Sequence, residues 1–164
     1  MEIERKWLVQ GWPEGLAPEH VYTMEQSYLC VRPTVRIRRE AESGGRTAHI
    51  LCFKGQGGLV REEIELEIDE DIFARLAAMI GQPLIRKERR DYRLPDGHVL
   101  EVNAVDPDAP TGFFYAEVEF ESEGAARAWQ PESAGLGSFL ANEVTEQRGV
   151  SMGAYWERTR HGTL

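Results

Sequence analysis

Charged side chains recur two residues apart along several short stretches of the sequence. An extended chain points alternate side chains to opposite faces, so residues spaced by two share one face. Each stretch therefore carries a row of charges on one face and mostly apolar residues on the other. In chain order, the rows consist of Glu2, Glu4 and Lys6; Arg36 and Arg38; Lys54; Glu63 and Glu65; Lys87 and Arg89; and Glu117 and Glu119.

The signs of these rows indicate what they do. A solvated face with ion pairs worth ~0–1 kcal/mol each explains any one row taken alone. It explains six rows less well, because solubility does not require signs to segregate by strand and neighbouring like charges repel. We therefore interpret the rows as the lining of an interior. Glu67 and Glu121, nearer the ends of their stretches, are expected to face solvent or to form structural pairs.

Two ligand chemistries suit such a lining. Rows of Arg and Lys bind phosphate oxygens through charge-assisted hydrogen bonds. Rows of Glu bind hard divalent cations such as Mg²⁺ or Mn²⁺ through oxygen. The two sets together predict a polyanion that is bound with its metal, and phosphoryl transfer needs little beyond positioning and charge neutralisation.

Eight short strands are predicted to carry these rows, since apolar alternation is interrupted by Gly, Pro, Asn and Asp turn residues. Their expected ranges are 2–9, 25–31, 34–40, 47–54, 60–68, 84–93, 98–105 and 113–121. Residues 11–24 are predicted to form a loop. Helical periodicity is found from Ile72 to Ile80, before Gly81, and helical pieces are expected at 125–129, 136–147 and 153–158. The predicted fold class is α+β, an eight-stranded antiparallel β-barrel with a few packed helices.

The composition is that of one globular domain, 1–164, that buries about 70% of its unfolded surface. A net charge of −9 disfavours a nucleic-acid partner. No apolar run reaches transmembrane length, and the charged start is unlike a signal peptide, so no membrane partner is expected. Cys30 and Cys52 form no CxxC pattern, which predicts a reduced, cytoplasmic setting.

Other chemistries fit the sequence less well. It contains no GxxxxGK[ST] phosphate loop, and Gly55 to Gly58 lie between strands, where a hairpin is their expected role. It contains no GxSxG motif, and neither cysteine has a marked His partner. Paired glutamates are typical of glycoside hydrolases, but the six accompanying cations argue against a neutral sugar.

The charged rows and their surroundings resemble the CYTH proteins, or triphosphate tunnel metalloenzymes. The start E-x-E-x-K is that family's signature, and further matching segments follow in the family's order over residues 1–121. These segments are Val35 to Arg38, Phe53 to Gly55, Arg61 to Glu65, Lys87 to Arg89, Leu100 to Val102, Ala116 to Phe120 and, near the C-terminus, Glu143 to Thr145.

The resemblance implies an eight-stranded antiparallel tunnel that binds a triphosphate and a divalent metal inside. It implies phosphate contacts from Lys6, Arg36, Arg38, Lys54, Lys87 and Arg89. It implies metal ligands among Glu2, Glu4, Glu63, Glu65, Glu117 and Glu119, with Glu101 a weaker candidate. Glu2, Glu4, Lys6 and Lys87 are taken as the catalytic group.

Two departures from the family pattern affect these expectations. Asn103 stands where the family often has Asp, so an oxygen ligand is kept and a charge is lost. Residues 147–153 lack a Tyr/Asn pattern found in many members, and this segment is expected to help close the tunnel.

The expected activity is metal-dependent hydrolysis of inorganic triphosphate, with Mg²⁺ or Mn²⁺ as cofactor and a small-molecule triphosphate as partner. Hydrolysis of thiamine or nucleoside triphosphate, cyclisation of ATP, and non-catalytic sensing of a polyphosphate remain alternatives, because this fold serves several reactions. An organic group would need aromatic linings such as Trp7, Tyr28, Phe113 or Tyr155, each of which is first expected to pack in the core or rim. A homodimer would form through a strand edge or the C-terminal helices.

Overall fold

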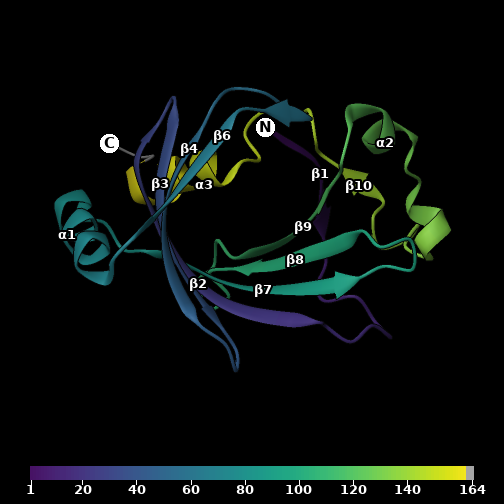
Figure 1. Cartoon of the computed structure of the whole chain (residues 1–164), viewed down its shortest axis with the longest axis horizontal. Coiled ribbons are helices and arrows are strands. Elements are labelled where there is room, and N and C mark those ends of the chain that lie inside the picture. The colour runs from purple at the N-terminus through teal and green to yellow at the C-terminus, as the bar shows by residue number, and fades with distance from the viewer. Residues whose placement is uncertain (162–164) are drawn as a thin grey trace.

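A computed structural model of the chain describes residues 1–161. Within that range the strands form one antiparallel sheet that curls around, with helices on its outside (Figure 1). The strands are β1 Glu2–Val9, β2 His20–Val31, β3 Thr34–Glu42, β4 Thr47–Lys54, β5 Val60–Arg61, β6 Glu63–Ile68, β7 Ile85–Arg93, β8 Val99–Val105, β9 Phe113–Glu119 and β10 Asn142–Glu143.

The sheet is nearly closed into a barrel. Neighbouring strands follow the order β10-β1-β9-β8-β7-β2-β3-β4-β6. Only Glu62 separates β6 from β5, and β5 pairs with β1 through Glu2↔Arg61 and Ile3↔Val60. The two ends of the strand order are therefore brought together by a bent strand, and this two-residue ladder is the thinnest part of the wall.

The predicted strands are found with shifted ends. The second strand begins at His20, so the prediction of loop up to residue 24 was wrong. Residues 20–24 pair with both β3 and β7, for example Tyr22 with Glu42 and with Arg89, and this tertiary pairing outweighs the local sequence signal. The fifth strand was predicted to be continuous but is interrupted at Glu62.

Three α-helices are present in the described residues: α1 Glu70–Ile80, α2 Glu123–Ala128 and α3 Met152–Trp156. A 3₁₀ turn follows α2 at Pro131–Ala134, and a π-helical turn, Glu157–His161, continues α3. Helix α1 begins where Asp69 accepts a 2.8 Å hydrogen bond from the Ile72 amide and ends at Gly81, whose φ of 72° favours glycine. None of these helices is long and apolar enough to cross a membrane.

The prediction of helix over residues 136–147 was wrong. Leu136, Leu140 and Val144 recur every four residues and all are buried, but turns and the short strand β10 present them to the core. Strand β10 adds to the outer edge of β1, where Asn142 pairs with Leu8. The four-residue spacing therefore predicted the burial of these side chains correctly and their secondary structure incorrectly.

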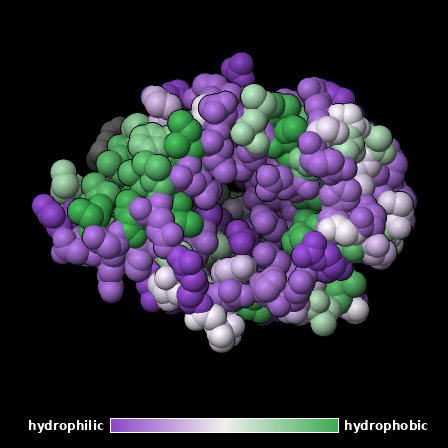
Figure 2. Space-filling view, in the orientation of Figure 1, coloured by the Kyte–Doolittle hydropathy of each residue, from purple (hydrophilic) through white to green (hydrophobic). Residues whose placement is uncertain are grey.

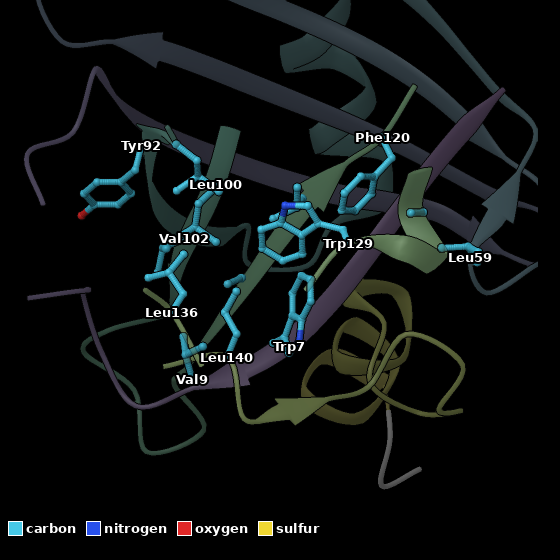
Figure 3. Packing of buried hydrophobic residues seen from close by; sticks show 14 residues of the cluster. Trp7, Val9, Leu59, Tyr92, Leu100, Val102, Phe120, Trp129, Leu136 and Leu140 are labelled. Atoms are coloured by element: carbon cyan, nitrogen blue, oxygen red, sulfur yellow. The ribbon is translucent and has the colours of Figure 1, made fainter. Parts of the chain in front are cut away.

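The main hydrophobic core lies outside the barrel, between the sheet and the α2 region. Figure 3 shows the rings of Trp7, Trp129 and Phe120 packed together, with Trp7 and Trp129 centroids 6.0 Å apart. Arg5, also on the outer face of β1, donates to the carbonyls of Ala126 and Trp129. Because Arg5 and Trp7 face outward, the alternate residues of β1 must face the interior.

Candidate active site

The interior of the barrel contains a polar cavity of about 160 Å³. Figure 2 shows it as a hollow near the centre of the molecule, surrounded by hydrophilic side chains. All twelve site residues predicted from the sequence line this cavity, and they come from six different strands. They are Glu2, Glu4, Lys6, Arg36, Arg38, Lys54, Glu63, Glu65, Lys87, Arg89, Glu117 and Glu119.

The lining is balanced in charge and sorted by strand. It contains seven cationic and seven carboxylate side chains, since Arg61 and Glu101 join the predicted twelve. Five of the cations lie on β7, β3 and β4, which are consecutive in the sheet apart from β2 between β7 and β3. We call this part of the wall the cationic arc. The carboxylates lie on β6, β1, β9 and β8, which form the rest of the wall and are called the carboxylate arc. Lys6 and Arg61 are the two cations within the carboxylate arc.

Carboxylates and cations neutralise one another where the two arcs meet. The Lys54 ammonium lies 3.3 Å from carboxylate oxygens of both Glu2 and Glu63. The Arg61 guanidinium lies 3.2 Å from Glu2 and 3.1 Å from Glu4. Glu2 is therefore shared by two cations that come from different strands.

Several buried donors of the cationic arc have no acceptor. The Nε atoms of Arg36 and Arg38 are buried and make no hydrogen bond to any part of residues 1–161. Buried polar groups are ordinarily hydrogen-bonded, and an unpaired one costs stability. Side chains with spare donors in a cavity are what an anion with many oxygen atoms requires.

Two lysines face the same cavity with depressed pKa values. Lys87 donates a 2.7 Å hydrogen bond to the Tyr115 hydroxyl. Burial and the nearby Arg38 charge lower its pKa well below the usual value. Lys6 donates to the Val150 carbonyl at 2.9 Å and lies 4.3 Å from the centre of the Tyr115 ring, and burial lowers its pKa as well. An anion bound between these lysines would stabilise their charged forms.

Several of the carboxylates show the opposite perturbation, whereas the hydrogen bond with Glu4 and the Lys6 charge lower the pKa of Glu117 to about 2 despite its burial. Burial and the adjacent Glu117 raise the pKa of Glu4 well above its usual value, and the two side chains are hydrogen-bonded to each other. Burial and a hydrogen bond to Glu63 raise the pKa of Glu2. Burial raises the pKa of Glu101 to about 7. Carboxylates that hold protons because they crowd one another release them to a cation, so this arc fits a hard divalent metal.

A second arrangement also suits a metal ion. Ligand atoms of Cys52, Glu63 and Glu65 lie within 4.8 Å of one another. The two carboxylates belong to the predicted metal set, whereas Cys52 was not among the predicted site residues. The oxygen-rich remainder of the lining favours a hard divalent cation over a softer metal.

The sequence analysis missed three strand residues of the lining, which are Thr34, Arg61 and Tyr115. Arg61 lies two residues before Glu63, and Tyr115 lies two residues before Glu117, so the same spacing rule extended backwards identifies both. Among the four aromatics considered, Tyr28 lines the cavity. Trp7, Phe113 and Tyr155 instead pack in the hydrophobic clusters, as first expected.

Charged residues at the strand ends take structural roles. Glu67 pairs with Arg46 on the surface. Glu121 pairs with His98 at 3.0 Å, on the exposed side of the α2 region. The expectation that these two glutamates lie outside the charged interior is confirmed.

The C-terminal segment lies against one end of the cavity. Ser151, Met152 and Gly153 contribute to the lining. The segment is held by Asp106, whose carboxylate accepts hydrogen bonds from Tyr155 at 2.6 Å and from Arg160 at 2.9 Å. A carboxylate outside the barrel therefore fixes the wall that these three residues provide.

Comparison with known proteins gives a consistent picture, although no family model matches the chain. An inorganic triphosphatase of Nitrosomonas europaea is 35% identical over 147 residues, which cover 90% of this chain and 91% of that protein. The crystal structure of inorganic triphosphatase NE1496 has a TM-score of 0.62 at 29% identity and covers 94% of this chain and 93% of its own. A putative adenylyl cyclase from Hippeastrum, described as having a dominant triphosphatase activity, also has a TM-score of 0.62. It covers 98% of this chain and 97% of its own, and at 17% identity this likeness concerns the fold alone.

Proposed function

The chain belongs to the CYTH family of triphosphate tunnel proteins, and from this premise we propose that it hydrolyses inorganic triphosphate inside its charged cavity. The products are pyrophosphate and phosphate, and the reaction uses a divalent cation, Mg²⁺ or Mn²⁺. The observation that carries the proposal is the sorted lining, in which a cationic arc with unpaired donors faces an arc of carboxylates that includes the hydrogen-bonded pair Glu4 and Glu117. The similarity to the Nitrosomonas europaea triphosphatase over 90% of the chain supports it.

The cationic arc is proposed to hold the triphosphate. Oxygens of the phosphoryl groups would be bound by Lys6, Arg36, Arg38, Lys54, Lys87 and Arg89. Arginine presents several donors in a fixed plane, which matches the oxygens of a phosphoryl group. Binding would pair the buried donors of Arg36 and Arg38 and would favour the charged forms of Lys6 and Lys87. Held in this way, the triphosphate loses most of its charge repulsion against an attacking water.

The carboxylate arc is proposed to hold the metal, through Glu2, Glu4, Glu63, Glu65, Glu117 and Glu119. When bound, a divalent cation neutralises charge on the phosphoryl oxygens and so favours cleavage. The overall reaction adds a water oxygen to phosphorus, breaks one bridging P–O bond and releases pyrophosphate, and a proton of the water passes to the products. Glu2, Glu4, Lys6 and Lys87 are proposed as the catalytic group, because all four line the cavity and the ammonium groups of Lys6 and Lys87 both lie near the Tyr115 ring.

The cavity fits an organic triphosphate less well than an inorganic one. Among the described residues, the aromatic side chains that line it are Tyr28 and Tyr115. Both hydroxyls are already engaged, with Gln26 and with Lys87. Neither ring is presented as a free platform for adenine or a thiamine ring, so the lining favours the inorganic substrate over ATP cyclisation.

The remaining features of the proposal concern the whole chain. We propose that residues 1–164 act as a single triphosphate tunnel domain with an eight-stranded wall, counting β5 and β6 as one bent strand. Cys30 and Cys52 are free thiols, which suits a reduced, cytoplasmic setting.

A homodimer is proposed through the outer face of β4 and β6, where Phe53, Ile64 and Leu66 remain 36%, 52% and 51% exposed. Figure 2 shows apolar side chains gathered on this side of the molecule.

A pair of neighbouring arginines on β3 tests the proposal. Arg38 lines the cavity, whereas Arg39 faces outward and lies 3.8 Å from Glu25. Arg38→Gln is expected to raise the KM for inorganic triphosphate about 10-fold or more in phosphate-release assays, because a charged phosphate contact is lost. Arg39→Gln should leave the KM within twofold. Equal KM values for the two variants would contradict binding inside the barrel.

A further inference from the structure

Asn103 is a fully buried side chain whose amide group is unused. It lies on β8, is 0% exposed and lines the central cavity. Neither its Nδ2 donor nor its Oδ1 acceptor has a hydrogen-bond partner in residues 1–161. An amide that is buried without partners destabilises the folded chain, whereas an apolar side chain of the same volume would not.

The surroundings of Asn103 point to the chemistry of the missing partner. Its cross-strand neighbours are Arg89 on β7 and Tyr115 on β9. The hydrogen bond from Lys87 to Tyr115 spans β8 beside it. These neighbours make Asn103 part of the cationic side of the cavity, although Glu101 precedes it by two residues on the same strand. A bare metal cation would be repelled by Arg89 and Lys87, whereas a phosphoryl group would be attracted.

We infer that Asn103 is a phosphoryl-binding residue for the triphosphate. Its Nδ2 donates a hydrogen bond to a phosphoryl oxygen that Arg89 and Lys87 also attract, and its Oδ1 accepts one from a water held against the same group. The amide suits this place because it supplies a donor, which a carboxylate would not, and adds no negative charge facing the anion. The inference rests on the function proposed above and adds a contact that is absent from the predicted phosphate-binding set.

The alternative role for Asn103 is that of a metal ligand through Oδ1. The two roles differ in what Asn103→Asp would do. A carboxylate at this position would strengthen a metal site, because it adds a charged oxygen ligand. The same carboxylate would weaken a phosphoryl site, because it removes the donor and repels the anion.

Calorimetric titration separates these roles. The probes are inorganic triphosphate in chelator and, in separate titrations, Mg²⁺ alone. Asn103→Asp is expected to lose at least 10-fold in affinity for triphosphate, with its Mg²⁺ affinity within twofold of the wild type. Asn142→Asp, on the exposed strand β10, adds the same charge away from the cavity and should bind both ligands within twofold of wild type. Unchanged triphosphate affinity, or tighter Mg²⁺ binding, in Asn103→Asp would overturn the inference.

A second variant distinguishes ligand binding from a structural role. Asn103→Ala has no polar atoms and fits within the space of the asparagine, so it should melt at or above the wild-type temperature without ligand while losing at least 10-fold in triphosphate affinity. A lower melting temperature with unchanged affinity would show that the amide is structural and would overturn the inference. If the wild type binds no triphosphate, the proposed function fails. If it binds and hydrolyses triphosphate but Asn103→Asp behaves like wild type, this inference alone fails.

Discussion

The Lys87 ammonium and the Tyr115 hydroxyl are joined by a 2.7 Å hydrogen bond that crosses strand β8 inside the cavity. Lys87 is buried among cations and is held by this neutral hydroxyl. The Tyr115 ring also lies under Lys6, 4.3 Å from its ammonium. One tyrosine therefore positions two lysines from opposite arcs of the wall, and an anion bound between them would favour the charged form of both.

Removing the hydroxyl should destabilise the ligand-free chain. Tyr115→Phe leaves the Lys87 ammonium buried without its acceptor, which is expected to lower the free energy of unfolding by about 1–3 kcal/mol. Saturating inorganic triphosphate supplies new acceptors and should narrow the difference from wild type. Chemical denaturation with and without triphosphate measures both effects. Tyr22→Phe, whose ring lies near Arg89 outside the cavity lining, is the matched control and should change stability by less. A Tyr115→Phe chain as stable as wild type without ligand would contradict this role of the hydroxyl.

The carboxylate arc should be required for turnover and not for anion binding. Glu117→Gln removes a buried carboxylate that is hydrogen-bonded to Glu4. It is expected to lower metal-dependent phosphate release about 10²-fold, because a proposed metal ligand is lost. Binding of triphosphate in chelator should be retained or tightened, since one negative charge facing the anion is gone. Glu121→Gln, four residues along the chain and paired with His98 outside the cavity, should keep the wild-type rate. A wild-type rate in Glu117→Gln would remove Glu117 from the metal assignment.

The sequence predicted the interior better than the boundaries of the elements. Alternation of charge on β1, β3, β6, β7 and β9 is a local property of extended chain, so it identified eleven of the twelve predicted lining residues, and Lys54 stands alone at the end of β4. The start of β2 was missed because residues 20–24 become strand only through pairing with β3 and β7. Such long-range pairing leaves no local signal in one sequence.

The C-terminal third shows a different limit. Leu136 and Leu140 have helical spacing and both are buried, yet they lie in a segment of turns. A spacing of four shows that two side chains face the same way, but it does not show that the backbone between them is helical. The roles of Asn103 and Tyr115 depended on which donors and acceptors remain unpaired or become paired after folding. These pairings are set by cross-strand register, which a sequence does not display.

The raised pKa of Glu101, about 7, predicts how stability changes with pH. The unfolded chain loses this proton near the ordinary glutamate pKa of 4.5, whereas the folded chain holds it until about pH 7. Protonated Glu101 therefore contributes stability that is fully present below about pH 4.5 and is lost as pH rises to about 7.

Glu101→Gln removes this contribution and should flatten the profile over the same window. Relative to wild type, the variant should gain on the order of 1–3 kcal/mol of unfolding free energy between pH 4.5 and pH 8. Denaturant titrations of both chains in metal-free buffer give the difference. Parallel profiles for the two chains would show that Glu101 ionises normally in the folded state.

The proposed homodimer can be tested on the outer face of β6. Leu66 is 51% exposed beside Ile64 on this face. Leu66→Lys places a charge in the proposed interface and should convert a dimer to a monomer in sedimentation velocity, with little change in melting temperature at high dilution. Leu16→Lys, at a 40% exposed leucine in the loop before β2, is the control and should leave the association state unchanged. A wild-type chain that is monomeric at high concentration would remove this interface.

The central claim is that the charged cavity hydrolyses inorganic triphosphate with a divalent metal. Phosphate release should be measured from inorganic triphosphate, thiamine triphosphate and ATP, each with Mg²⁺, with Mn²⁺ and with chelator, while cyclic AMP is assayed in parallel. The account predicts release chiefly from inorganic triphosphate, dependent on the metal and lost in Glu117→Gln. Formation of cyclic AMP with pyrophosphate, or tight binding of triphosphate without any turnover in either metal, would contradict it.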